Sequence, residues 1–221
     1  MVKFYPPKAG DPYYDATTGR DAFPPDANAH VEQFARGELL ERPGEPVSAL
    51  RVLISGRAKI YMIHGDGRQS ILQFLEPGDY VGELSLLGVE AEPKYVEALS
   101  PCMTLTLPFA GNEAKLLTDA AFLRKLCAFL AKKLLARSER LTQNLNYPLR
   151  NRLASLILTA AHDGAYTLRH AEAAEYLGVS YRHLLYSLAR FREEGLVEKR
   201  GREYFVKDPV ALRRLAGDIR A

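Results

Sequence analysis

The feature that most constrains this chain is a long segment without a helix breaker. Residues from about 112 to 146 contain no proline or glycine and are rich in Ala, Leu, Lys and Arg, so the segment 111–146 is predicted to be one long helix. Its narrow apolar stripe recurs about every 3.5 residues and is interrupted at Arg137. This stripe predicts a two-stranded coiled-coil seam between two copies of the chain, and packing on the β-domain of the same chain is the alternative. The seam residues are Leu123, Cys127, Leu130, Leu134 and Leu141.

The residues before this helix have the texture of short strands. Between about Phe34 and Pro108, apolar runs such as ALRVLI, AKIYMI, SILQFL and MTLTLP alternate with turn signals such as Pro77-Gly78-Asp79. Strands of this length and regular punctuation predict an antiparallel sandwich or barrel over residues 31–110. Residues 1–30, with two Pro-Pro pairs, are predicted to form an extended N-terminal arm that Phe23 and three tyrosines could hold in place.

Composition sets the broad class of protein. The 221 residues are 47% hydrophobic and 26% charged, which is typical of a soluble globular chain, and no apolar run reaches the length of a membrane span. Residues 147–221 hold 13 Lys+Arg against 9 Asp+Glu, net +4, whereas residues 1–146 hold 17 against 18, net −1. A basic C-terminal third is a weak indication of nucleic-acid binding. Two cysteines and no secretory signal favour a reduced, cytoplasmic setting, and Cys127 is expected to be a small buried hydrophobe.

Residues 147–221 are predicted to be a winged helix-turn-helix domain. A short helix from Arg169 to Leu177 is followed by Gly178, which can take the left-handed backbone of a helix end, and Ser180 is a good N-cap for the next helix. The buried face of that second helix is expected to consist of Leu184, Leu185, Leu188 and Phe191. Two helices joined by a tight turn are typical of a DNA reader.

The outer face of the second helix carries cations and aromatics, and a basic turn between two short strands follows it as a wing. A cationic stripe of this kind can contact bases and phosphates. The predicted DNA-binding residues are Arg169, Ser180, Tyr181, Arg182, His183, Tyr186, Arg190, Arg200 and Arg202.

With these residues assigned, the chain resembles the Crp/Fnr superfamily of bacterial transcription regulators. The resemblance covers about residues 30–206. It is carried by RPGEPVSALRVLISGRAKIYM from residue 42, LEPGDYVGELSLL from 75, and FLRKLC, RLTQN and AAEYLGVSYRHLLYSLARF from 122, 140 and 173. The last three strings are most similar to the YeiL-like subset. The resemblance implies an α+β homodimer with an N-terminal double-stranded β-helix (cupin-like β-roll) sensor domain, a long dimerisation helix and a C-terminal winged helix-turn-helix.

The sensor site departs from the cyclic-nucleotide-binding members that it resembles. Glu83 matches the carboxylate that would hold a ribose hydroxyl, but Glu92-Pro93 stands where those members have Arg-Ser. Facing a carboxylate in place of a guanidinium should weaken phosphate binding by about three orders of magnitude. We therefore expect that the sensor does not bind cyclic AMP by the family's usual chemistry. A modified pocket that uses Lys94 is the alternative, and the pocket residues are predicted to be Gly82, Glu83, Leu84, Ser85 and Lys94.

The remaining expectations concern partners and competing functions. Arg182 and Tyr186 stand where a Glu and an Arg read the half-site in the best-known members, so the pseudo-palindromic operator on double-stranded DNA should differ from theirs. The resemblance also allows a contact with RNA polymerase. No cofactor, metal or membrane partner is predicted, because residues 1–101 hold no cysteine cluster and the β-region lacks the paired histidines of a cupin metal enzyme. A module whose helix-turn-helix mediates only protein contacts is the third alternative.

Overall fold

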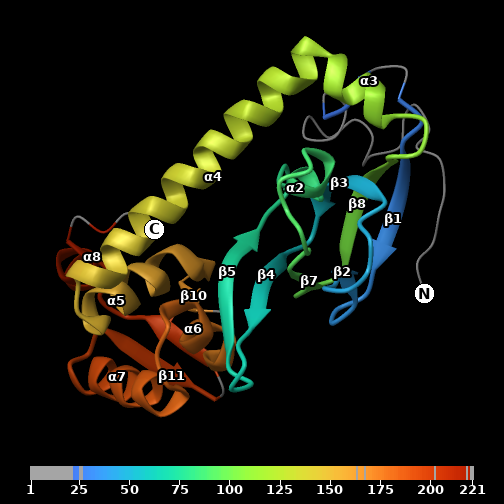
Figure 1. Cartoon of the computed structure of the whole chain (residues 1–221). Helices are drawn as coiled ribbons and strands as arrows, with labels where there is room; N and C mark the ends of the chain where they lie inside the picture. Colours follow the sequence, from blue (N-terminus) through green and yellow to red (C-terminus); the bar gives the residue numbers. More distant parts are fainter. Residues whose placement is uncertain are drawn as a thin grey trace. The chain divides into compact units, whose positions relative to one another are not determined.

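The computed structural model describes residues 22–24, 27–162, 164–166, 168–201, 203–217 and 219 (Figure 1). The chain divides into two compact units, residues 1–133 and residues 134–221. This division falls inside the long helix, whereas the sequence placed domain boundaries on either side of it, at 110/111 and 146/147.

The described part of the first unit contains two four-stranded antiparallel sheets. In one sheet the order is β1 (His30–Phe34), β8 (Cys102–Pro108), β3 (Ala49–Ser55) and β6 (Tyr80–Val81). In the other it is β2 (Leu39–Glu41), β7 (Tyr95–Ala98), β4 (Ala58–Ile63) and β5 (Gln69–Leu75). The four apolar runs noted in the sequence are therefore β3, β4, β5 and β8, and the predicted antiparallel roll is confirmed.

Side chains from both sheets meet in a shared apolar core, as the alternation of strand side chains requires. The core residues include Phe34, Leu53, Val81 and Cys102 from the first sheet and Leu40, Ile60, Leu75 and Val96 from the second. The opposite face of the first sheet packs on helices through a second core, which contains Val52, Leu107, Leu116, Phe122 and Leu126. Phe23 is buried in this second core, and Tyr80 donates a hydrogen bond to the carbonyl oxygen of Ala22 over 3.0 Å. The rest of the predicted arm, residues 1–21, lies outside the described residues.

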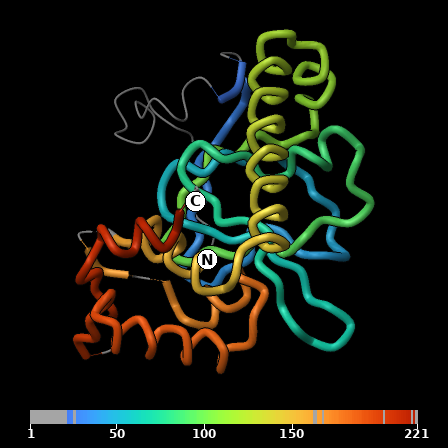
Figure 2. The backbone as a smooth tube through the Cα atoms, turned by 90° about the vertical axis from the view of Figure 1, so that its left-hand side faces the viewer, coloured from blue at the N-terminus to red at the C-terminus, as the bar shows by residue number. Residues whose placement is uncertain are grey.

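The single helix predicted over 111–146 is wrong in one respect, because the structure has two helices there. α3 spans Glu113–Thr118 and α4 spans Ala120–Asn146. Between them Asp119 has an extended backbone, and its Oδ1 accepts a hydrogen bond from the backbone N–H of Phe122 over 2.8 Å. Asp119 is thus an N-cap, the strongest local signal for a helix start in this stretch. α4 itself runs as one continuous coil (Figure 2).

Among its described residues, the second unit contains the end of α4, four further helices and a small sheet. The helices are α5 (Leu149–Ala160), α6 (His170–Leu177), α7 (Tyr181–Glu193) and α8 (Pro209–Ala216). The sheet order is β11 (Val197–Arg200), β12 (Glu203–Val206), β10 (Ala165–Tyr166) and β9 (Ala161–His162). The predicted helix-turn-helix and wing are α6, α7 and the β11–β12 hairpin. The sequence interpretation had not included β9, β10 or α8.

In the part of the chain that the structure describes, no helix has both the length and the apolarity needed to cross a membrane. The same residues contain no group of three or more histidine, cysteine, aspartate or glutamate side chains arranged to hold a metal ion.

Candidate functional site

The turn between α6 and α7 has the geometry that its sequence predicts. Gly178 lies in the left-handed region at φ 66°, where only glycine is free of strain, and its N–H bonds back to the carbonyl of Ala174. Ser180 Oγ accepts a hydrogen bond from the N–H of His183 over 3.2 Å and so caps α7. These two local interactions fix where α6 ends and α7 begins.

α7 presents one apolar face to the unit and one polar face outward. Leu184, Leu188 and Phe191 are buried as expected. Leu185 is exposed, so its assignment to the buried face is wrong. The reason is helical geometry: Leu185 follows Leu184 by about 100° around the axis, which turns it out of a stripe that 184, 188 and 191 already fill.

The outward face of α7 carries the predicted reading residues. Tyr181, Arg182, His183 and Tyr186 are all exposed, with 61% of Tyr186 accessible. Arg182 and Tyr186 are four residues apart and therefore lie on the same face, one turn from each other. Arg190 continues this face but has a carboxylate partner, since its Nη2 lies 3.8 Å from Glu194 Oε1. The N-terminal half of α7 is thus the part left open for a ligand.

The wing and the start of α6 place the remaining predicted cations. In the hairpin, Arg200 Nη2 lies 3.0 Å from Glu198 Oε2, and the Arg200 guanidinium stacks over the ring of Phe205. Arg169 precedes α6 with an exposed side chain, 3.8 Å from Glu172. Arg202 lies outside the described residues. Both arginines are therefore largely exposed, and each has a carboxylate partner close to it in the sequence.

An aromatic cluster beneath the start of α6 was missed in the sequence. The ring of His170 stacks on Tyr166 at 6.1 Å and meets the edge of Tyr204 at 5.4 Å. Burial, with a smaller effect of the Lys199 charge, lowers the pKa of His170, and burial raises the pKa of the Tyr166 hydroxyl. The cluster depends on the pairing of β10 with β12. These strands are far apart in the sequence, so no local pattern predicts their contact.

The first unit holds Glu83, the predicted pocket carboxylate, in an internal ion pair. Glu83 opens α2 (Glu83–Leu86) directly after Gly82, which has φ 89° and no room for a Cβ because the carbonyl oxygen of Ala49 would lie 2.6 Å away. The Glu83 side chain is buried, and its Oε1 lies 2.5 Å from the Nζ of Lys133 on α4. Lys133 is itself buried and also sits over the ring of Phe129. The carboxylate that resembles a ribose ligand is therefore already neutralised by the chain.

Further carboxyl groups surround this ion pair. Burial raises the pKa of Glu41 to about 8, against the smaller opposing effects of the Arg51 and Lys133 charges, and burial also raises the pKa of Asp79. At neutral pH Glu41 is therefore mostly uncharged. Lys133 is the cation that acts on both groups, so removing it would leave this part of the unit with an excess of buried acids.

Lys94, the predicted alternative phosphate ligand, is engaged by its own loop. Its Nζ donates to the carbonyl oxygen of Glu92 over 3.1 Å and lies 3.7 Å from Glu90 Oε1. Leu84 and Ser85 follow Glu83 on α2 and are half-buried. The structure thus places Gly82, Glu83, Leu84 and Ser85 together at α2, and gives Lys94 partners that are carbonyl and carboxylate oxygens.

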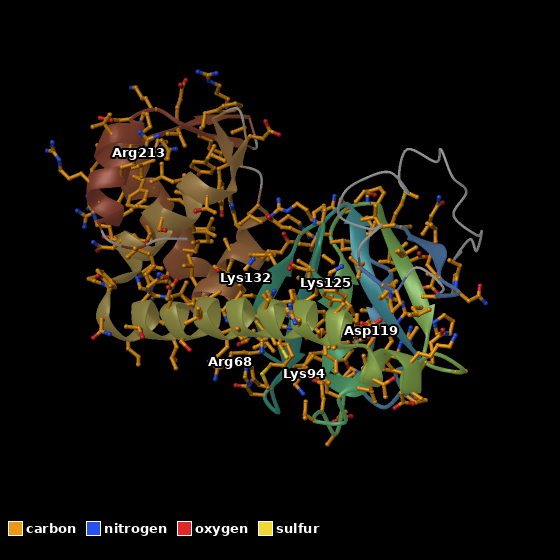
Figure 3. All side chains as sticks on the ribbon, turned by 90° about the horizontal axis from the view of Figure 1, so that it is seen from above. Arg68, Lys94, Asp119, Lys125, Lys132 and Arg213 are labelled. Atoms are coloured by element: carbon orange, nitrogen blue, oxygen red, sulfur yellow. The ribbon has the colours of Figure 1, made fainter. Side chains whose placement is uncertain are left out.

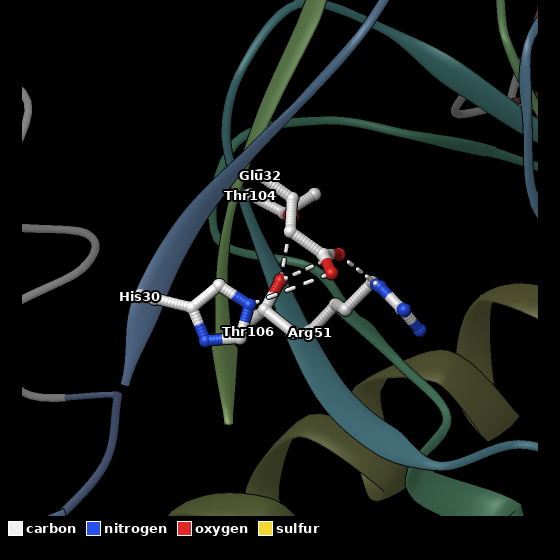
Figure 4. Close-up of polar contacts among 5 residues, drawn as sticks. All are labelled: His30, Glu32, Arg51, Thr104 and Thr106. Atoms are coloured by element: carbon white, nitrogen blue, oxygen red, sulfur yellow. Dashed lines mark hydrogen bonds and ion pairs between the residues drawn. The ribbon is translucent and has the colours of Figure 1, made fainter. Parts of the chain in front are cut away.

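A buried polar network in the first sheet was also missed in the sequence (Figure 4). Glu32 Oε2 accepts hydrogen bonds from Arg51 Nε over 2.7 Å and from Thr106 Oγ1 over 3.0 Å, and His30 Nε2 lies 3.5 Å from Glu32 Oε1. Thr104 joins through Thr106. Glu32 is buried, and its hydrogen-bond donors come from β3 and β8, so its charge is compensated by residues on neighbouring strands.

The predicted seam divides into two parts along α4. Leu123 and Leu130 are half-buried against the second core of their own unit. Cys127, Leu134 and Leu141 are exposed, so Cys127 is not buried within its own chain as expected. Own-chain packing, the alternative left open by the sequence, therefore describes the first part of α4, and the later part keeps an uncovered apolar stripe with Leu135 and Leu145.

Comparison with known proteins identifies both units. Residues 31–119 match the model of the cyclic nucleotide-binding domain, and residues 151–215 match that of the Crp-like helix-turn-helix domain. The chain is 39% identical over 199 residues to the regulatory protein YeiL of Escherichia coli O157:H7, covering 89% of this chain and 91% of that protein. The chain belongs to the Crp/Fnr family. It is a DNA-binding transcription regulator and not an enzyme.

More distant members of the Crp/Fnr family share the same architecture. A Crp-family transcriptional regulator from Thermus thermophilus superposes with a TM-score of 0.73 at 27% identity, covering 84% of this chain and 96% of that one. A relative from Mycobacterium tuberculosis is 24% identical over 193 residues, 83% of this chain and 86% of its own length, and its name describes it as a cAMP-activated global transcriptional regulator. The predicted α+β class is thus confirmed.

Proposed function

We propose that this Crp/Fnr regulator acts as a homodimer that reads a pseudo-palindromic operator with the N-terminal half of α7. The observation that carries the proposal is the orientation of α7. Arg182 and Tyr186 are exposed on one face while Leu184, Leu188 and Phe191 are buried on the other. A guanidinium in this place can bind a guanine edge with two hydrogen bonds, and a tyrosine can meet a thymine methyl or donate its hydroxyl.

Neighbouring cations support a role in positioning the helix on the duplex. Arg169 has an exposed side chain at the start of α6, and Ser180, Tyr181 and His183 surround the start of α7. Backbone N–H groups and arginines at such places bind phosphates, which orients a reading helix without selecting a sequence. Specificity is therefore assigned to Arg182 and Tyr186, and general affinity to Arg169 and the wing.

The test compares specific with non-specific binding. An operator is first selected from random duplexes with the intact protein. Arg182→Ala and Tyr186→Ala should then each weaken binding to that operator by about 1–3 kcal/mol, or about 5- to 150-fold. Fluorescence anisotropy at one fixed salt concentration measures both the operator and a scrambled duplex of the same length.

Arg192→Ala is the matched control, because Arg192 is exposed at the opposite end of the same helix. It removes one positive charge and should weaken both duplexes equally and slightly. Unchanged operator binding in Arg182→Ala and Tyr186→Ala, or an equal loss on both duplexes, would remove the recognition role from this face.

We also propose that the sensor unit does not bind cyclic AMP by the chemistry of its cAMP-activated relatives. The ion pair between Glu83 and Lys133 supports this, because a ribose hydroxyl would have to displace a buried ammonium from the carboxylate. Glu92 and Pro93 add a negative charge and remove a backbone donor where the phosphate would lie.

The alternative is a nucleotide-responsive regulator with a modified pocket that uses Glu83 and Lys94. The name of the mycobacterial relative favours it. The engagement of Lys94 by Glu90 and Glu92 weighs against it. RNA polymerase remains a further proposed partner, which the family resemblance alone supports.

A further inference from the structure

The first turn of α5 donates hydrogen bonds to the ends of four other helices. Its residues Arg150, Asn151 and Arg152 are consecutive, and successive residues of an α-helix point about 100° apart around the axis. Each of the three side chains therefore reaches a different neighbour. We name residues 150–152 the α5 hub.

Arg150 and Asn151 hold the ends of α7 and α8. The Arg150 guanidinium binds the carboxylate of Glu194, the C-cap residue of α7, with two parallel hydrogen bonds, of which Nη1 to Oε1 measures 2.7 Å. Asn151 Nδ2 donates to the carbonyl oxygen of Leu215 in the last turn of α8 over 2.8 Å. Carbonyl groups in the last turn of a helix have no partner inside the helix, so donors from α5 complete them.

Arg152 joins the long helix to the helix-turn-helix. Its Nη1 donates to Asn144 Oδ1 on α4 over 2.7 Å and to the carbonyl oxygen of Leu177, the last residue of α6, over 2.8 Å. Its Nε donates to the carbonyl oxygen of Tyr147 over 3.1 Å. One side chain therefore bridges the end of α4 and the residue that precedes the Gly178 turn.

The bridge spans a place where apolar packing is incomplete. A cavity of about 130 Å³ lies here, lined by Arg140, Asn144, Arg152, Tyr176 and Leu177 among others. Across it the Arg140 guanidinium stacks on the ring of Tyr176 at 4.9 Å. Because apolar side chains do not fill this space, polar contacts join α6 to the end of α4 here: the hydrogen bonds of Arg152 and the stacking of Arg140 on Tyr176.

The position of the two arginines is unfavourable for α5 itself. Cations in the first turn of a helix oppose its macrodipole, and α5 has no acidic residue there. The same cations lie favourably at the C-terminal ends of α6 and α7. The two arginines are therefore unfavourable for the dipole of α5. The contacts that compensate for this go to α4, α6 and α7, the elements that position the helix-turn-helix.

We infer that Arg152 is a positioning residue that sets the spacing of the half-sites this regulator accepts. The inference rests on the proposed function, in which two copies dimerise along α4 and each reads DNA with α7. The exposed leucines of α4, Leu134 to Leu145, belong to the same unit as the reader. A rigid connection between the end of α4 and the helix-turn-helix holds the two α7 helices of a dimer at one separation. A loosened connection lets that separation vary.

The test measures spacing rather than affinity alone. Arg152→Gln should bind a duplex with a single half-site within about twofold of wild type, but bind the full operator about tenfold more weakly, because a loose joint lowers the effective concentration of the second reader. Its preference for the native spacing over operators lengthened or shortened by two base pairs should shrink by a similar factor. Arg152→Lys keeps the charge, cannot make the three-way bridge, and should behave like Arg152→Gln.

Arg213→Gln is the matched control, since Arg213 lies on the exposed side of α8 in the same unit (Figure 3). It should leave the spacing preference intact. If Arg152→Gln does not fold, Asn144→Ala removes one acceptor on α4 and should give a smaller loss of the same preference. An equal loss on half-site and full operator, or an unaltered spacing preference, would overturn the inference. Failure of wild-type protein to bind any operator would instead overturn the proposed function.

Discussion

At the residue scale, the sensor site shows what a local pattern can and cannot indicate. Gly82 and Glu83 were assigned from the resemblance of LEPGDYVGELSLL to the Crp/Fnr superfamily, and the structure places them together at the start of α2. Their partner Lys133 is 50 residues further along the chain. It was not predicted because the pairing depends on which face of α4 packs on the roll, and a lysine in a charged helix carries no sign of burial.

The ion pair leads to a prediction about ligand response. Cyclic AMP at about 1 mM should not raise the melting temperature of the wild-type protein, because the pocket is expected not to bind it. A ligand that binds the folded state with a micromolar dissociation constant would instead stabilise the protein by about 4 kcal/mol at this concentration. Differential scanning fluorimetry measures this, with 5′-AMP as the control ligand. A rise of several degrees with cyclic AMP alone would contradict the proposed role of Lys133 and favour the modified pocket.

At the scale of elements, the caps decided which boundaries could be predicted. The α6–α7 turn was correct because Gly178 and Ser180 act through bonds to residues only a few positions away. The break at Asp119 was missed because the long stretch lacks proline and glycine, and the Asp itself was read as a helical residue. The strands β9 and β10 were missed because each has two residues and depends on pairing with the distant β12.

The Asp119 cap gives a stability prediction. Asp119→Ala should lower the free energy of unfolding by about 1 kcal/mol, within the range of about 0.5–2 kcal/mol that N-cap losses show, because the N–H of Phe122 loses its acceptor. Urea denaturation followed by circular dichroism measures the change. Asp119→Asn keeps a side-chain oxygen in the same place and should lose much less. Equal losses in the two variants would mean that the charge of Asp119, and not its cap, stabilises this corner.

At the scale of the whole molecule, one helix serves two purposes along its length. In its first part α4 buries Phe122 and Leu126 on its own roll. In its later part it leaves Leu134 and Leu141 more than half exposed, at 66% and 61%. The periodicity alone could not separate these stretches, since an apolar stripe looks the same whichever surface covers it. The seam between two copies stays a prediction for the later part.

That seam predicts the behaviour of a double variant. Leu134→Glu combined with Leu141→Glu should raise the dimer dissociation constant by at least about two orders of magnitude, because each leucine that the seam buries contributes about 1.5–3 kcal/mol and each copy of the chain loses two. Analytical ultracentrifugation measures the assembly state. Lys132→Glu should leave it unchanged, because Lys132 is exposed and two residues of an α-helix are about 200° apart, which puts it on the side away from Leu134. A wild-type protein that is monomeric at tens of micromolar would refute the seam.

The narrow reading face of α7 has a consequence for target choice. Two side chains one helical turn apart can contact only neighbouring base pairs, and the second copy in a symmetric dimer contacts the same short sequence again. A base sequence this short recurs by chance throughout any chromosome. Such a protein must therefore obtain the rest of its selectivity from how readily each candidate promoter curves and narrows between the half-sites, so bases that no side chain touches should still decide which genes it governs.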